Sequence, residues 1–466
     1  MQMQSKKLSQ PPYSPLIITV FILSLIYWLY LGLTTQMNIV FDSLGYESLG
    51  RLILNQGWLA YFQTGPNREP IYPLLVAGAM GIQNLTGMAF VKIMAFLGAI
   101  LMLLTQVLTY QLLRLLNIRN GICAFVLIYF ALSPALNNAA FSLYSEIAAF
   151  PIILGIVLAS VLAWDSIQHN KWFRALVFGT LLGILLSAVT FVKAVFECIT
   201  PVYLVFFFAA VLKSCNNDFK KIIPFMFCLL TAIGCFYGPI TAYKWLNFKY
   251  NGNFVITNRG SWALYGNTAR RMEPLTVKRL LEALAFVPGE GVCNGLFGPK
   301  ECDFWSYRKS DELGFAKQDE LANHHLSSEQ LNAALLKASA SKALHNPFQY
   351  ALLTLTEGLK MFFWESTKIG FVGYPHWLQR IYDIKLFNNA LRFWLALISG
   401  IAVFSLWRQM LSATCPPLVF VMGLLIFLYI FFFSFFFILT RYALPLAPLY
   451  LAGIALGINQ IFASKK

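Results

Sequence analysis

Apolar segments as long as a bilayer is thick recur along this chain and constrain its fold more than any other feature. A helix needs roughly 20 apolar residues to cross the hydrocarbon core of a membrane. Stretches such as 15–33 and 418–437 reach that length without one charged residue. Hydrophobic residues make up 58% of the chain and charged residues 12%, which excludes an ordinary soluble domain. The sequence therefore predicts an all-α polytopic membrane protein.

The distribution of lysine and arginine orients the predicted spans. Every loop predicted to lie inside is basic, as the positive-inside rule requires, so both termini are expected inside. The net charge of +15 could instead suggest nucleic-acid binding. Much of the lysine and arginine lies in short loops beside helix ends, however, which accounts for the charge, so no nucleic-acid partner is expected. About ten spans are predicted, at 15–33, 86–113, 121–134, 141–164, 175–190, 196–212, 222–243, 387–407, 418–437 and 442–462.

A long hydrophilic segment interrupts this series and divides the chain into three parts. Residues 1–245 form a transmembrane module that carries the external loop 36–72. Residues 246–385 contain no apolar run of spanning length, which predicts an external domain, expected to be mixed in secondary structure. Residues 386–466 return to the membrane as the C-terminal transmembrane helices.

The loop 36–72 gathers ionisable residues beside a span, where charges are costly and by default mark a functional site. Apolar residues after Asp42 recur at helical spacing, which predicts a helix lying along the membrane surface. Asp42 has two interpretations, the N-cap of this helix or a reactive carboxylate. The ionisable residues of the loop are Asp42, Glu47, Arg51, Arg68 and Glu69.

Three further ionisable residues are predicted near the same outer face. Glu146 lies within about two turns of the outer end of its span. Lys193 and Arg441 lie at outer turns, where few cations are expected. A snorkelling lysine and an interfacial anchor are the alternative interpretations of these two residues. Cations at the outer lipid–water boundary would neutralise a phosphate carried by a lipid.

A phosphate-binding face beside a carboxylate suits a reaction in which a lipid phosphate leaves a sugar. The cations would stabilise the charge that develops on the phosphate. The carboxylate would accept the proton of the attacking hydroxyl, and a single base implies inversion at the sugar carbon. Asp42 is the best candidate base because it begins the loop and has no basic neighbour in sequence.

The cysteines divide between the predicted compartments. Six of the eight fall in spans or inner loops, whereas Cys293 and Cys302 lie in the predicted external domain. Their setting among glycine and proline, PGEGVCNGLFGPKECDFW, suits a local disulfide in an oxidising compartment. A zinc site, the alternative, would need two more ligands, for which the nearby sequence offers no obvious pair.

Short polar motifs follow one another over nearly the whole chain. In order they are FDSLGY, REPIYP, SLYSE, FVKAVFECITP, GPITAYKWLNFKYNGNFVITNRG, HNPFQY and TRYALPLAP. Their order resembles that of the GT-C superfamily of polytopic glycosyltransferases. The chain is particularly similar to the protein O-mannosyltransferases (glycosyltransferase family 39) and the lipid A aminoarabinose transferases. No single motif is specific; the series is.

This resemblance implies a GT-C-like bundle and a role for each motif residue. Asp42 would be the general base, Arg68 and Glu69 would line the donor headgroup site, and Lys193 and Arg441 would hold the lipid phosphate. It also implies a polyprenyl-phosphate sugar donor, an unidentified hydroxyl acceptor (lipid, glycan or protein), contact with membrane lipids, and an active site on the periplasmic face of a bacterial inner membrane. The other candidate site residues are Tyr46, Tyr72, Glu146, Arg259 and Tyr442.

Two questions stay open at this level. Many relatives carry Asp-Glu where this chain has Asp42 and Ser43, so no cofactor or metal ligand is assigned, and a divalent metal stays an alternative. A polyprenyl-diphosphate glycan ligase or polymerase would share the topology and differ in its leaving group. A lipid-linked-sugar transporter or flippase would be expected to show a repeated half or broken helices in matching positions, which the sequence lacks.

Overall fold

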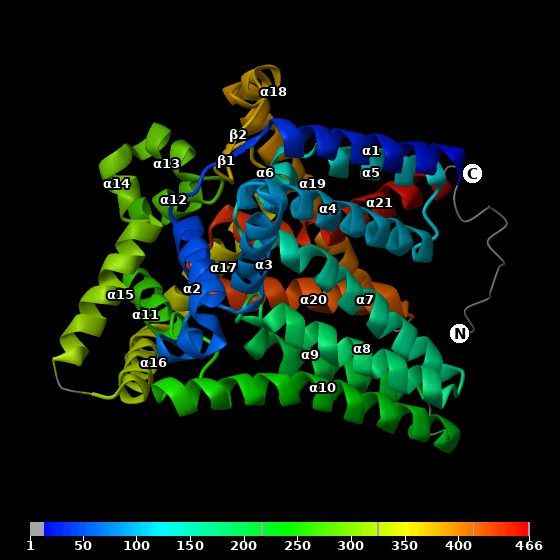
Figure 1. The fold of residues 1–466 in the computed structure, drawn as a ribbon, viewed down its shortest axis with the longest axis horizontal. Helices are drawn as coiled ribbons and strands as arrows, with labels where there is room; N and C mark the ends of the chain where they lie inside the picture. The colour runs from blue at the N-terminus through cyan, green and yellow to red at the C-terminus, as the bar shows by residue number, and fades with distance from the viewer. Residues whose placement is uncertain (1–13, 216–217, 324–325, 413, 465–466) are drawn as a thin grey trace.

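The computed structural model describes residues 14–215, 218–323, 326–412 and 414–464. These residues fold almost entirely into helices, and nine of their helices are long and apolar enough to span a membrane. The predicted all-α polytopic membrane fold is therefore confirmed (Figure 1). The nine are α1 (Pro15–Thr34), α4 (Phe90–Leu115), α7 (Glu146–Gln168), α8 (Trp172–Thr190), α9 (Phe196–Ser214), α10 (Phe219–Asn251), α19 (Lys385–Met410), α20 (Pro417–Ser434), and η2 with α21 (Thr440–Leu446 and Ala447–Ser464).

A tenth apolar segment is broken into two helices. α5 (Asn120–Leu132) and α6 (Pro134–Phe141) meet at an angle of 51°. Proline cannot donate a backbone hydrogen bond, so the break must be satisfied by other groups. The buried carboxylate of Glu365 accepts hydrogen bonds from the Ser133 hydroxyl at 2.6 Å and the Ala135 amide at 2.8 Å. The predicted short span at 121–134 thus continues past its bend to Phe141.

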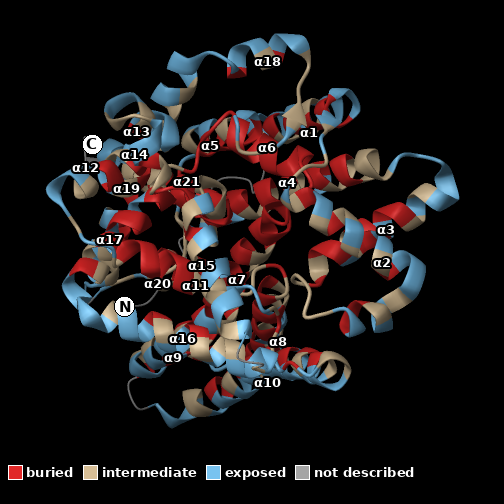
Figure 2. Ribbon diagram, turned by 90° about the vertical axis from the view of Figure 1, so that its left-hand side faces the viewer, coloured by how far each residue is buried: buried red, intermediate tan, exposed pale blue. Residues whose placement is uncertain are grey.

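The bundle has one central helix and several peripheral ones. Of the most apolar window of α7, 83% of residues are buried within the protein, against 28% for α10 and for α19. Figure 2 shows the same contrast, with buried residues gathered on the inner helices. Exposed leucines of α1, such as Leu23 and Leu33, lie on a face that lipid can cover. α7 therefore provides the fixed frame of the molecule.

The loop after α1 forms two helices that pack against each other, α2 (Asp42–Gln63) and α3 (Ile71–Thr86). A helix beginning at Asp42 agrees with the apolar spacing of the sequence. α7 differs from its predicted span 141–164, because residues 142–145 are not helical and the helix begins at Glu146. This shift places the Glu146 carboxylate in the first turn of the central helix, where the helix dipole favours an anion.

The residues between α10 and α19, 252–384, are called here the interspan segment. Their described part is helical rather than mixed; its one short strand, β2 (Val372–Gly373), pairs antiparallel with β1 (Gln36–Met37). α10 runs through the predicted boundary at 246 and ends at the left-handed Gly252. The segment contains α11 (Gly260–Arg271), α12 (Val277–Phe286), α13 (Glu290–Phe297), α14 (Pro299–Asp303), α15 (Tyr307–Ala322), α16 (Ser328–His345), α17 (Pro347–Leu359), η1 (Lys360–Phe362) and α18 (His376–Tyr382).

The interspan helices α11 to α16 gather at one end of the bundle, while α1 begins and α21 ends at the other (Figure 1). The start of α2 lies at the interspan end, as does the start of α7. The fold therefore brings the charged loop, the first turn of the central helix and the interspan segment together.

Candidate functional site

A cavity of about 870 Å³ lies where these three parts meet. Its volume falls within the usual range for small-molecule sites. Of the residues predicted for the site, Tyr72 and the two cysteines do not line it. Those that do are Asp42, Tyr46, Arg68, Glu69, Glu146, Lys193, Arg259, Arg441 and Tyr442. Residues up to 399 positions apart in sequence thus face one space.

Asp42 lies between two arginines. The guanidinium of Arg68 donates to Oδ1 at 2.7 Å, and the guanidinium of Arg441 donates to Oδ2. Burial alone would raise the pKa of Asp42, but the charges of Arg441 and Arg68 outweigh it and hold the pKa well below its ordinary value. Asp42 is therefore an anion whose lone pairs are already engaged by cations.

The N-cap interpretation of Asp42 is wrong. The residue that precedes the first turn of α2 is Phe41, whose φ of 52° is left-handed, and no side chain caps this helix. Asp42 is the first helical residue, and its carboxylate points away from the helix amides to the two arginines. Asp42 has no basic neighbour in sequence, but the fold brings it Arg68 from the end of the same loop and Arg441 from 399 positions away.

A second ion pair lies beside the first. Lys193 Nζ donates to Oε1 of Glu146 at 2.9 Å, and Arg441 Nε lies 3.9 Å from the same oxygen. Burial disfavours the charge of Lys193, but Glu146 outweighs burial, so the pKa of Lys193 lies above its ordinary value. The side chain of Lys193 is only 13% exposed, which excludes the snorkelling interpretation. The second carboxylate oxygen of Glu146 is buried without a described partner.

Glu69 and the tyrosines hold these groups in place. Glu69 Oε1 accepts the Ala194 amide at 3.0 Å and so ties the loop to the turn that carries Lys193. The guanidinium of Arg68 lies over the Tyr46 ring, 4.7 Å from its centre. Tyr72 packs edge-on against Tyr46 at 4.8 Å, which makes it a support for the cavity wall rather than part of its surface.

The Arg441 side chain is enclosed by two tyrosine rings. Its guanidinium lies 4.5 Å from the centre of Tyr144 and 5.6 Å from that of Tyr442. Cation–π contacts of this kind fix a guanidinium that must also reach a carboxylate. Tyr144 was not among the predicted site residues, although it lies within the motif SLYSE. The arginine's several contacts do not fit the interpretation of an interfacial anchor.

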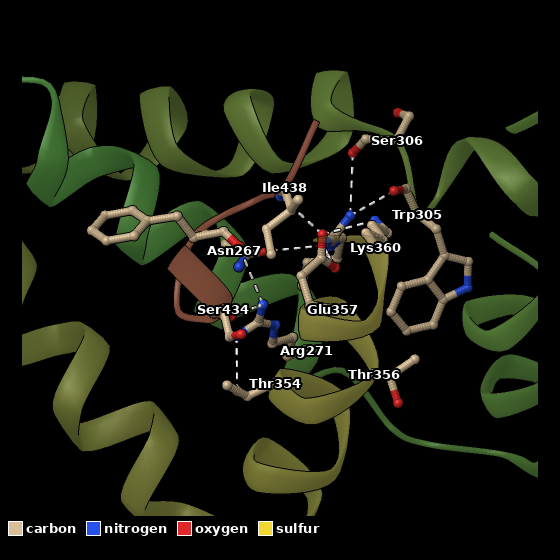
Figure 3. A network of polar contacts seen from close by, with 12 residues as sticks. Asn267, Arg271, Trp305, Ser306, Thr354, Thr356, Glu357, Lys360, Ser434 and Ile438 are labelled. Carbon is tan, nitrogen blue, oxygen red and sulfur yellow. Dashed lines mark hydrogen bonds and ion pairs between the residues drawn. The ribbon is translucent and has the colours of Figure 1, made fainter. Parts of the chain in front are cut away.

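A buried charge cluster fixes the chain just before Arg441 (Figure 3). Arg271 donates to the carbonyls of Ser434 at 2.6 Å and Phe436 at 3.3 Å, and Glu357 accepts the Ile438 amide at 3.0 Å. These bonds come from α11 and α17 and hold the connection between α20 and η2. The cluster consists of Arg270, Arg271, Glu357 and Lys360, each at most 5% exposed. Sequence reasoning missed it, because a double arginine in a hydrophilic segment resembles a solvated surface.

The far wall of the cavity belongs to the interspan segment. Arg259 precedes α11, Trp262 lies in its first turn, and Tyr307 and Asp311 lie on α15. Of these only Arg259 was singled out in the sequence. Asp311 gave no signal, because it lies among many other charged residues in a helix-prone stretch.

Cys293 and Cys302 lie outside the lining of this cavity. Cys293 and Cys302 form a disulfide with sulfur atoms 1.94 Å apart, buried beside Trp305 in a small core of the interspan segment. Within the part of the chain that the structure describes, no group of three or more histidine, cysteine, aspartate or glutamate side chains could hold a metal ion.

No protein-family model and no curated protein matches this sequence.

Proposed function

We propose that the protein is a membrane glycosyltransferase that moves a sugar from a polyprenyl-phosphate donor to a hydroxyl acceptor, with inversion. The observation that carries this proposal is the meeting of three cations, Arg68, Lys193 and Arg441, with the carboxylate of Asp42 in one cavity. The predicted resemblance to the GT-C superfamily supports the same reading. The donor phosphate would bind the cations, which suit a dianionic or monoanionic phosphate ester.

The walls of the cavity also suit the rest of such a donor. Phenylalanine rings from the end of α20 and the connection after it line the cavity next to the cations. An isoprenoid chain is apolar, so these rings offer it a surface that leads from the bilayer to the phosphate site. The rings are those of Phe432, Phe433, Phe436 and Phe437.

Donor binding would raise the activity of the base. While both guanidinium groups pair with Asp42, it is a weak base, because they stabilise its anion. A phosphate that binds Arg441 or Arg68 takes that guanidinium from Asp42, and the basicity of the carboxylate rises. Asp42 would thus become a stronger base only when the donor is bound, and before that it would stay unprotonated.

The transfer step follows from these roles. The acceptor oxygen attacks the anomeric carbon, and the new carbon–oxygen bond forms as the bond from that carbon to the phosphate oxygen breaks. The electron pair of the broken bond leaves on the phosphate, where the cations stabilise it. The proton of the acceptor hydroxyl passes to Asp42. One displacement of this kind inverts the sugar carbon.

The cavity would face the periplasm of a bacterial inner membrane, with both termini in the cytoplasm. Basic residues such as Lys171, Lys213 and Arg408 lie at or beside the opposite ends of their spans, as the positive-inside rule requires. A cysteine introduced at Glu320 should react with a reagent that cannot cross membranes, and one at Asn170 should not. The reverse pattern would invert the proposed orientation.

The direct test uses purified protein, radiolabelled polyprenyl-phosphate sugars and membrane extract as the source of acceptor. Label should move from the lipid phosphate to a product whose anomeric configuration is inverted, which mass spectrometry and glycosidase digestion identify. Transfer from a polyprenyl-diphosphate donor alone would instead favour the ligase or polymerase function.

A further inference from the structure

The two walls of the cavity differ in how their charges are satisfied. On the bundle side, the carboxylates of Asp42 and Glu146 are each held by cations of the same wall. On the interspan side, no hydrogen bond or ion pair joins the side chains of Arg259 and Asp311 to any residue of the described ranges. Their hydrogen-bonding capacity is available to a ligand.

The position of Asp311 is fixed by tight packing between α11 and α15. A methyl group added at Gly266 would lie 1.9 Å from the carbonyl oxygen of Ser310, and one at Gly314 would lie 2.6 Å from that of Trp262. Only glycine allows the two helices to approach this closely. Ser310 and Asp311 are therefore held at the cavity wall by rigid elements, which a binding site requires.

The wall combines groups that suit a carbohydrate. Burial raises the pKa of Asp311, with Arg259 opposing this effect and Asp42 adding to it, so the carboxylate is a good hydrogen-bond acceptor for a hydroxyl. Trp262 and Tyr307 add aromatic surface beside it. Trp262 is itself stacked on Phe315, with ring centres 4.3 Å apart, which restrains its orientation.

A second cavity of about 280 Å³ continues from this wall and shares Arg259 and Trp262 with the first. Side-chain amides and a hydroxyl contribute much of its lining. The Oε1 atom of Gln318 is buried there without a described hydrogen-bond partner. Such a lining suits a polyhydroxylated ligand rather than a lipid tail. Its polar residues are Asn258, Arg259, Gln318, Ser328 and Asn332.

We infer that the interspan wall is the acceptor subsite and that the acceptor is a carbohydrate chain. Asp311 and Arg259 hold hydroxyls of the accepting sugar opposite Asp42, and the second cavity takes the next sugar of the chain. This inference rests on the proposed function and adds the class of its acceptor. Asp311 acts as a binding and positioning residue, while the proton of the reacting hydroxyl still passes to Asp42.

The test compares Asp311→Asn with Asp319→Asn, an exposed residue of the same helix outside both cavities. Two quantities are measured on folded protein: transfer of labelled sugar to membrane extract, and affinity for polyprenyl phosphate alone. Asp311→Asn should lower transfer by roughly tenfold to a hundredfold, the scale of one hydrogen bond to a charged group. Its affinity for polyprenyl phosphate should stay within about twofold of that of the unaltered protein, and Asp319→Asn should change neither quantity. Mass spectrometry should find the label on a sugar hydroxyl.

Several results would overturn the inference while leaving the proposed function intact. Unchanged transfer by both Asp311→Asn and Arg259→Ala would exclude the subsite. An equal loss of transfer and of polyprenyl-phosphate affinity would place Asp311 with the donor instead. Label on a protein or lipid hydroxyl would exclude a carbohydrate acceptor. Failure of the unaltered protein to bind polyprenyl phosphate or to transfer any sugar would remove the proposed function and this inference together.

Discussion

Two groups of buried charges lie at the same end of this molecule, and they differ in what their cations bind. In the buried charge cluster, called here the sealed cluster, Arg270 and Arg271 donate mainly to backbone carbonyls. Glu357 is the one carboxylate among the three cations of this cluster. In the cavity, Arg68 and Arg441 bind the side chain of Asp42. A backbone carbonyl cannot leave its place, whereas a side-chain carboxylate can be replaced by a ligand's anion.

This difference separates structural from functional burial of charge. The sealed cluster satisfies backbone hydrogen-bonding groups in the connection that leads to Arg441. None of its four residues lines the cavity. The cavity charges keep surface open to a ligand, with the Asp42 side chain 31% exposed. A buried ion pair is by itself weak evidence for stability or for function. The surroundings of the paired side chains, either packed protein or a cavity open to a ligand, decide between a structural and a functional role.

The largest expected effect is that of Asp42→Asn, which removes the anion and keeps the size of the side chain. Turnover should fall by roughly 10²–10⁴-fold, the usual scale for loss of a general base. Because the two arginines lose the anion that competes for them, affinity for polyprenyl phosphate should rise. Both quantities are measured on detergent-purified protein, with Glu47→Gln, on the same helix but outside the cavity lining, as the matched control. Near-normal turnover by Asp42→Asn would contradict the mechanism.

The sealed cluster should respond in stability instead of chemistry. Glu357→Gln leaves three buried cations without their carboxylate, which should lower the free energy of unfolding by about 3–5 kcal/mol. Denaturant unfolding in mild detergent measures this change. Polyprenyl-phosphate affinity of the folded fraction should change little. An unaltered unfolding midpoint would mean that the cluster does not hold the α20–η2 connection.

A smaller effect is expected when one cation of the cavity is removed. Arg441→Ala and Lys193→Ala should each weaken polyprenyl-phosphate binding by roughly tenfold to a hundredfold, as loss of a charge-assisted contact does. Arg51→Ala, on the exposed face of α2, is the control and should bind normally. Binding by either variant that matches the control would remove that cation from the donor site.

The spans and the charged loop could be predicted from sequence, because apolar length and helical spacing are local properties. The pairing of Asp42 with Arg441 could not, since Arg441 lies 399 positions away in the sequence. The start of α7 differs from the prediction for a similar reason. The Tyr46 hydroxyl donates to the Ser145 hydroxyl at 3.0 Å, within a non-helical stretch that hydropathy assigns to the span. Asp311 could not be predicted from the sequence, because its place at the cavity depends on which face of α15 packs against α11.

The smallest expected effect distinguishes the two groups by the sign of their pH dependence. Burial lowers the pKa of Lys360. The attraction of Glu357 opposes this effect, but Arg270 and Arg271 add to it, so the pKa lies below its ordinary value. Between that lowered pKa and the ordinary value of about 10.4, the unfolded chain binds more protons than the folded protein. The contribution of Lys360 to the free energy of unfolding therefore rises with pH. Lys193 has the opposite shift, since Glu146 is its close partner. Its contribution is complete below its ordinary pKa and is lost as pH rises toward the raised one.

Each lysine can change the slope of unfolding free energy against pH by at most about 1.4 kcal/mol per pH unit. Lys360→Met should therefore remove a rising component at alkaline pH, and Lys193→Met a falling one. Only the slopes are compared, so a constant loss of stability in either variant does not affect the result. Equal slopes for the Lys360 and Lys193 variants would mean that the two clusters hold their charges in the same way, and the distinction between a sealed and an open charge group would fail.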